Sequence, residues 1–127
     1  SLICYFVINL NKRKKDIRKF LNIIENSVIE SLKKYNIQSR SDKNNIGIWV
    51  KSNNDLKKIG AIGIRVRKWI AYHGFSLNIN NDLNNYNKII PCGIKDRSIT
   101  SLEEIKNQNY KTLPNELIKN LINNLKI

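Results

Sequence analysis

The hydrophobic pattern of this chain changes its period once near the start, and this change constrains the fold more than any other feature. Residues 2–10 are almost continuously apolar and rich in β-branched and aromatic side chains, which is typical of a buried strand. From Asp16 onward, apolar residues recur every three or four positions, which predicts one face of a helix of about five turns over residues 16–35. The apolar positions of this face are Ile17, Phe20, Leu21, Ile24, Val28, Leu32 and Tyr35.

The middle of the chain is strand-like and its end is helical. Further strands are expected at residues 48–50, 59–66 and 69–79. The residue types at 52–55 favour a turn, and a helical pattern with a proline near its start returns at residues 114–126. Strands clustered between two helices predict the α+β class, with the helices packed on a mixed β-sheet.

Three glycines interrupt the predicted strands, at Gly60, Gly63 and Gly74. A glycine inside a strand often marks a bulge or a place where a ligand approaches the backbone closely. A polar loop is expected at residues 80–87. Residues 100–103 have the sequence form of a capping box, which predicts the start of a short helix.

With 127 residues, the chain is long enough for one compact domain and too short for two ordinary ones. No apolar run approaches the roughly 20 residues needed to span a bilayer, and the opening run lacks the features of a signal peptide. The two cysteines, Cys4 and Cys92, have no Cys or His partner at metal-ligand spacing, so we expect neither a disulfide framework nor a bound metal. These features predict a cytoplasmic protein with no membrane partner.

The net charge of +13 is weaker evidence for a polyanionic partner than its size suggests. Ile, Asn and Lys, which share A/T-rich codons, occupy 60 of the 127 positions. The basic residues concentrate in two places, at residues 12–19 and at Arg65, Arg67 and Lys68, and aromatic residues do not interleave with them as in an RNA-binding array. A basic nucleic-acid-binding module therefore stays an alternative that rests on charge alone, and we expect no nucleic-acid partner.

Residue types alone leave the chemistry open. The sequence has no phosphate-binding loop and no other nucleotide fingerprint. Cys92 lies in a bend between Pro91 and Gly93, where it is either a reactive thiol or a small buried hydrophobe. Cys4 lies in the middle of a strand, which favours the core. His73 is the sole histidine, and a lone histidine is more often structural. Lys57 and Lys58 form a pair at a strand start that is usually solvated.

Four segments in order carry a resemblance to a known family. They are residues 58–66 (KIGAIGIRV), 73–80 (HGFSLNIN), 91–94 (PCGI) and 100–102 (TSL), and the upstream GIWV at residues 47–50 agrees with them. Together they resemble the octanoyltransferases of lipoate biosynthesis, which implies the fold of the biotin/lipoate protein ligase superfamily. The family's R-G-G-x-x-T-Y-H-G-P-G-Q segment is expected just before residue 1. Residues 1–127 are therefore expected to be a single, N-terminally truncated catalytic domain.

The resemblance implies an acyltransferase that moves an octanoyl group from acyl carrier protein to a lysine of a lipoyl domain. Cys92 would be the acyl-thioester nucleophile, and Lys58 would lower the pKa of its thiol and act as a general acid or base. No cofactor is implied. The acceptors would be the lipoyl domains of 2-oxoacid dehydrogenase complexes and the H protein of glycine cleavage. The residues that would line the acyl site are Ala61, Ile62, Gly63, His73, Gly74, Phe75 and Ser76.

An ATP-dependent lipoate or biotin ligase of the same fold is the alternative. The Pro91-Cys92-Gly93 element and the lack of a recognisable nucleotide loop argue against it. Arg65, Arg67 and Lys68 flank the predicted acyl-site strands, so they are expected to steer acidic partners more than the basic residues at 12–19 do. The isolated 127-residue chain is expected to have little activity, because half of the implied acyl pocket would be missing.

Overall fold

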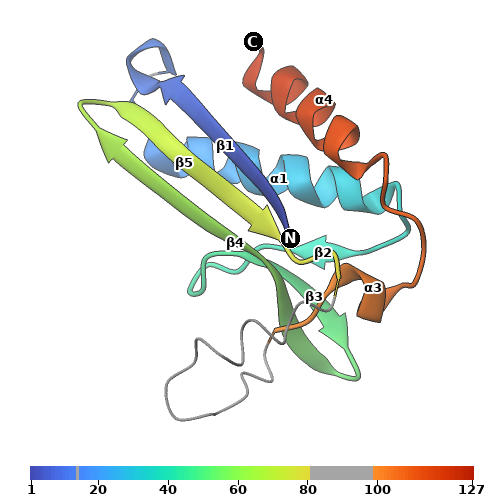
Figure 1. Ribbon diagram of the computed structural model, residues 1–127. Helices are drawn as coiled ribbons and strands as arrows, with labels where there is room; N and C mark the ends of the chain where they lie inside the picture. The colour runs from blue at the N-terminus through green and yellow to red at the C-terminus, as the bar shows by residue number, and fades with distance from the viewer. Residues whose placement is uncertain (14, 81–98) are drawn as a thin grey trace.

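The computed structural model describes residues 1–13, 15–80 and 99–127. Its elements run in the order β1 (Leu2–Asn9), η1 (Leu10–Arg13), α1 (Ile17–Lys33), β2 (Ser39–Arg40), β3 (Ile48–Ser52), β4 (Asp55–Arg67), β5 (Ile70–Leu77), α3 (Leu102–Ile105) and α4 (Leu113–Leu125) (Figure 1). None of these helices is long and apolar enough to cross a membrane.

Within the described residues, five strands form one sheet in the order β1-β5-β4-β3-β2, and neighbouring strands are antiparallel. A parallel bridge between Lys58 and Ile99 makes the pairing mixed. Both tight hairpins have two central residues with positive φ, Asn53 and Asn54 before β4 and Lys68 and Trp69 before β5. Two such residues are what a two-residue turn of type I′ requires, and that turn follows the natural twist of the strands.

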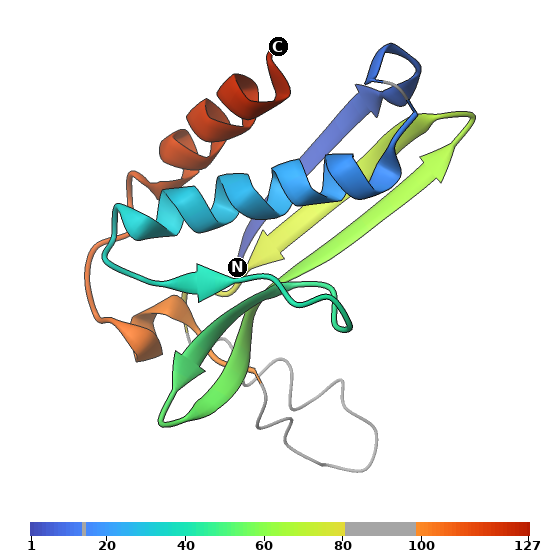
Figure 2. The same ribbon diagram turned by 180° about the vertical axis from the view of Figure 1, so that it is seen from behind.

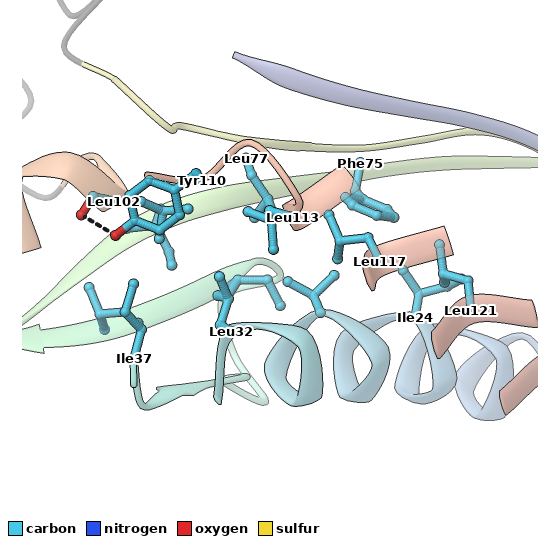
Figure 3. Packing of buried hydrophobic residues seen from close by; sticks show 14 of the residues in the cluster. Ile24, Leu32, Ile37, Phe75, Leu77, Leu102, Tyr110, Leu113, Leu117 and Leu121 are labelled. Carbon is cyan, nitrogen blue, oxygen red and sulfur yellow. Dashed lines mark hydrogen bonds between the residues drawn. The ribbon is translucent and has the colours of Figure 1, made fainter. Parts of the chain in front are cut away.

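Helices α1 and α4 cover one face of the sheet (Figures 1 and 2). The core between them is aliphatic and aromatic, and it includes Ile24 and Leu32 of α1, Leu117 of α4 and Phe75 and Leu77 of β5 (Figure 3). The hydrophobic period of 3.6 residues thus places one stripe of each helix against the strands. The prediction of an α+β fold with helices packed on a mixed sheet is confirmed.

Local signals begin each helix close to the predicted positions. Asp16 caps α1, and its side chain accepts a hydrogen bond from the backbone N–H of Lys19 at 2.9 Å. Ser101 caps α3 in the same way through the N–H of Glu104. Pro114 lies in the first turn of α4, where its missing N–H costs no helical hydrogen bond.

No helix among the described residues covers the other face of the sheet, called the open face below, and this corrects the prediction that residues 2–10 form a buried strand. Strand β1 lies at the sheet edge and alternates, with Tyr5 and Val7 each 74% exposed and Ile3 53% exposed. Leu2, Cys4, Phe6 and Ile8 face the other way and pack against the core. A nearly continuous apolar run therefore corresponds here to an edge strand with one buried and one exposed apolar face.

The remaining differences concern element lengths. Strand β4 begins at Asp55, four residues before the predicted strand, because it continues through the hairpin that pairs it with β3. The two-residue strand β2 was not expected, since its pairing with Val50 and Trp49 is the only signal that defines it. The polar loop predicted for residues 80–87 and the bend at 91–93 lie mostly or entirely outside the described residues.

Candidate active site

A hollow of about 370 Å³ lies on the open face of the sheet, over β1, β5 and β4. It is lined by Ile3, Tyr5, Ala61, Gly63, His73, Gly74, Phe75 and Ser76. Six of the seven residues predicted for the acyl site therefore line one depression, although they come from two strands. Of these six, Phe75 lines the hollow although it is only 4% exposed and belongs to the core. The seventh predicted residue, Ile62, packs against the core and does not line the hollow.

Strand register explains how this hollow is made. Ile3, Ser76 and Ala61 form one cross-strand row, and Tyr5, Gly74 and Gly63 form the next row. Residues in register on adjacent strands share a face of the sheet. The second row contains two glycines side by side. No side chain rises from the sheet at these two positions, which leaves a depression between the flanking rows.

The two glycines of that row are present for different reasons. A Cβ on Gly74 would lie 1.9 Å from the carbonyl oxygen of Cys4, so the close approach of β1 excludes any side chain. A Cβ on Gly63 would meet no atom of the described residues within 4 Å, and its φ is not positive. Within that part of the chain, neither packing nor backbone conformation requires glycine at position 63. Its effect is to leave the hollow open.

His73 departs from the alternation of its strand. It pairs with Phe6 and Ile64, which both pack against the core, yet His73 is exposed and lines the hollow. Its φ of +72° lies in the left-handed region, which is rare for a residue other than glycine. Its ring lies against that of Tyr72, with the centroids 4.9 Å apart. A residue held in such a conformation is a reason to look for function nearby.

Lys58 projects from the same open face, further along β4. It pairs with Trp49, and its ammonium nitrogen lies 5.8 Å from the centroid of the Trp49 ring. Because Ile48 and Val50 on either side of Trp49 are buried in the core, the Trp49 and Lys58 side chains lie on the opposite, open face. Gly47 leaves room for the lysine, since a Cβ there would lie 2.6 Å from Lys58 Cε.

The segment that carries Cys92 starts and finishes beside Lys58. The N–H of Asn78 donates to the carbonyl of Ile59 at 2.7 Å, and the N–H of Thr100 donates to the carbonyl of Lys58 at 3.0 Å. Asn78 and Thr100 are also joined directly, through the Asn78 Nδ2 and the Thr100 carbonyl at 3.3 Å. Cys92 itself lies outside the described residues, so its distance from Lys58 stays a prediction.

The second cysteine has the properties of a core residue, as its sequence context predicted. Cys4 is half-buried and packs against the hydrophobic core on the covered face. Burial raises the pKa of the Cys4 thiol, which lowers the fraction of nucleophilic thiolate. This residue is therefore a poor candidate for covalent chemistry.

Sequence reasoning missed four residues of the site. Ile3 and Tyr5 were assigned to a buried strand, and only their exposure on an edge strand shows them as walls of the hollow. Gly47 and Trp49 belong to a segment that resembles the octanoyltransferases, but the sequence did not indicate that they lie beside Lys58. A positive φ at Gly47 leaves no trace in the sequence except the glycine itself.

Comparison with known proteins gives the family. The profile of the lipoyl protein ligase A/B catalytic domain matches residues 1–126. The chain therefore belongs to that family.

Curated relatives in the same family are more specific in name. The chain is 48% identical over 103 residues to the octanoyltransferase of Zymomonas mobilis, which covers 81% of this chain and 48% of that protein. It is 43% identical over 106 residues to the octanoyltransferase of Rickettsia bellii, covering 81% of this chain and 51% of that protein. The chain thus spans about half the length of these relatives.

Solved structures support the fold. The apo structure of biotin protein ligase from Aquifex aeolicus aligns with a TM-score of 0.70 at 24% identity, covering 96% of this chain and 51% of that one. A lipoate-protein ligase A bound with ATP aligns with a TM-score of 0.67 at 19% identity, covering 88% of this chain and 47% of that one. The expected biotin/lipoate protein ligase fold is confirmed.

Proposed function

We propose that this chain is part of an octanoyltransferase of lipoate biosynthesis, an enzyme that holds the acyl group as a thioester on Cys92. The observation that carries the proposal is that the hollow, over β1, β5 and β4, and the Lys58 side chain of β4 lie on the same open face of the sheet. The names of relatives at 43–48% identity support octanoyl transfer as the reaction. On this proposal, residues 1–127 belong to one catalytic domain.

The first step transfers the acyl group to the enzyme. The Cys92 thiolate attacks the thioester carbonyl carbon of octanoyl-acyl carrier protein, the new carbon–sulfur bond forms, and the carrier leaves as a thiolate that takes up a proton. Only the thiolate is nucleophilic, so a nearby ammonium that lowers the thiol pKa speeds this step. Lys58 supplies that ammonium, since both ends of the Cys92 segment are hydrogen-bonded beside it.

The second step releases the product. The ε-amine of a lipoyl-domain lysine attacks the carbonyl carbon of octanoyl-Cys92, an amide bond forms, and the Cys92 thiolate leaves. The proton lost by the attacking amine goes to a base, a role that Lys58 fills while it is neutral. The first step exchanges one thioester for another and keeps the acyl group activated, and the conversion of thioester to amide in the second step is downhill, so the reaction needs no ATP.

The hollow is the proposed acyl site. An octanoyl chain needs a groove free of side chains on its floor and apolar side chains at its walls. Gly63 and Gly74 provide the floor, Ile3 and Tyr5 the walls, and His73 and Ser76 the polar groups at the edge. The partners are acyl carrier protein as donor and, as acceptors, lipoyl domains of 2-oxoacid dehydrogenase complexes and the glycine cleavage H protein, in the cytoplasm.

Mass spectrometry of the chain after long incubation with excess octanoyl-acyl carrier protein tests this proposal, because it detects a single acylation of the thiol even when turnover is slow. We expect an octanoyl adduct on Cys92 that disappears in Cys92→Ser and persists in Cys4→Ser. An adduct on Cys4 would contradict the assignment. Acyl transfer that requires ATP and survives Cys92→Ser would instead favour a lipoate or biotin ligase of this fold.

The role of Lys58 has its own matched control in Lys57. Lys57 is the adjacent lysine of β4 and pairs with the buried Val50, whereas Lys58 pairs with Trp49 on the open face. We expect Lys58→Ala to move the pH profile of Cys92 alkylation to higher pH and Lys57→Ala to leave it unchanged. Identical profiles for the two variants would show that Lys58 does not lower the thiol pKa.

A further inference from the structure

The two basic clusters of the sequence meet at one end of the molecule. The η1 turn carries Lys12 and the β4–β5 turn carries Lys68. Figures 1 and 2 show these two turns side by side. The N–H of Leu10 donates to the carbonyl of Trp69 at 2.7 Å, and the Lys15 ammonium lies 5.6 Å from the Trp69 ring centroid. The basic cluster at residues 12–19 and the one at residues 65–68 are about 50 residues apart in the sequence, and the fold brings them together.

A groove of about 590 Å³ opens at this end, on the helix side of the sheet. It lies between the end of β1, the start of α1 and the end of α4. The guanidinium of Arg13 donates to the carbonyl of Leu125 and so ties η1 to the last turn of α4. The apolar side chains that line the groove are Ile8, Phe20, Ile23, Leu125 and Ile127.

The rim of this groove is almost entirely cationic. Lys12, Arg13, Lys19 and Lys126 line it, and Lys12, Lys19 and Lys126 are exposed. The one carboxylate among the residues lining the groove is that of Asp16, which already accepts the hydrogen bond that caps α1. An apolar floor enclosed by cations matches a ligand that is apolar on one side and anionic on the other.

We propose that this groove docks an acidic amphipathic helix of a partner protein. An α-helix is about 10–12 Å wide with its side chains, and its apolar face would cover the floor while Glu or Asp side chains meet the rim lysines. Concentrated positive charge would steer such a partner and speed its binding. Single-stranded nucleic acid fits less well, because the one aromatic ring in the lining, Phe20, is 2% exposed and offers no face for base stacking.

This docking surface is separate from the candidate active site and does not depend on the chemistry of Cys92. Along β4, nine residue steps lead from Lys58 to Arg67 at the basic end, a distance of about 30 Å at the rise of a strand. Arg65, Arg67 and Lys68 were expected to steer acidic partners more than the residues at 12–19 do. The structure places Arg67 and Lys68 at the hairpin turn beside η1, so the two clusters form one basic end.

Fluorescence anisotropy with a defined probe tests the proposal. The probe is a labelled amphipathic helical peptide of about 16 residues, about 24 Å long, with Leu on one face and Glu on the other. We expect the double variant Lys12→Glu, Lys19→Glu to weaken binding about tenfold at low salt. The matched control is Lys106→Glu, Lys111→Glu, which makes the same charge change at exposed positions away from the groove and should weaken binding less than about twofold.

A second pair of measurements separates docking from general charge attraction. Ile127→Ser removes an exposed apolar residue that lines the groove without changing charge, and we expect it to weaken peptide binding about threefold. Equal losses for the rim variant and its control would overturn the proposal. So would a single-stranded oligonucleotide that binds more tightly than the peptide and whose binding does not respond to Ile127→Ser. If circular dichroism shows that the glutamate variant does not fold, the Lys12→Gln, Lys19→Gln variant applies the same test with a smaller charge change.

Discussion

The two faces of the sheet are made by the same strands but differ in the size and the exposure of their side chains. On the face covered by α1 and α4, side chains such as Leu77, Phe75 and Ile48 are at most 4% exposed and fill the core. On the open face, the strands present Gly63 and Ser76 beside Tyr5, which is 74% exposed. Large apolar side chains fill the space between the sheet and the helices on the covered face. The open face has small residues at the hollow and carries Lys58 and His73 of the candidate site.

Residue type alone does not reveal which face of the sheet carries the candidate site. Ile3, Tyr5 and Val7 are as apolar as their neighbours on the covered side, and they are nevertheless exposed. Exposed apolar side chains beside a hollow are typical of a surface that binds a ligand or a partner protein. The difference between the faces is best tested where a residue on one face has a counterpart on the other.

The two adjacent glycines should give the largest contrast. Gly74→Ala forces a Cβ to within 1.9 Å of the Cys4 carbonyl oxygen, so β1 and β5 must separate, and we expect a loss of more than about 3 kcal/mol or failure to fold. Gly63→Ala meets open space and should stabilise the protein by about 0.4–1 kcal/mol, because alanine loses less chain entropy on folding. Urea unfolding measures both. A destabilised Gly63→Ala would contradict the view that this glycine is not needed for packing.

Truncation of one aliphatic residue on each face should give the next largest difference. Leu77 is fully buried, so Leu77→Ala leaves a cavity and should cost about 2–5 kcal/mol of unfolding free energy. Ile3 is 53% exposed, and Ile3→Ala should cost less than about 1 kcal/mol. Denaturant midpoints with unchanged slopes would check this. Similar costs at both positions would mean that something covers the open face.

The two cysteines extend the comparison to reactivity. Because burial raises the pKa of the Cys4 thiol, little thiolate is present near neutral pH, and Cys4 should react with iodoacetamide several times more slowly than it does in urea. Peptide mapping after brief labelling at pH 8 measures the rate at each cysteine. We expect label on Cys92 first. Equal labelling of Cys4 in the native and the unfolded chain would show that the covered face is not closed.

The smallest effect concerns the outer side of the covering helices. The Lys34 ammonium pairs with the Glu116 carboxylate, and this hydrogen bond holds the pKa of Glu116 below its ordinary value. A carboxyl group whose pKa is lower in the folded state stabilises the fold above its ordinary pKa, and that stabilisation is lost as the pH falls through the folded value. Glu116→Gln should therefore lower Tm slightly at pH 7, with a difference that vanishes in acid. A Tm difference that persists at pH 2 would have another cause.

Much of the fold was predictable because its signals are local. The helix predicted at residues 16–35 forms over Ile17–Lys33, and the one predicted at 114–126 forms over Leu113–Leu125, since a period of 3.6 residues is a property of a short stretch of chain. Turn-forming residues marked the hairpin at Asn53 and Asn54. For the candidate site, the segments that resemble octanoyltransferases indicated residues that the structure gathers into one hollow.

Other features depended on contacts between distant residues, and no local pattern encodes those contacts. Sequence alone determined an α+β fold with two amphipathic helices and a cysteine in the core. Only the tertiary structure decided that Tyr5 is exposed, that His73 turns toward the hollow and that Gly47 makes room for Lys58. It also joined two basic clusters that are far apart in the chain. The physical reason is that periodicity follows from neighbouring residues, whereas a surface follows from strand register and from which face the helices cover.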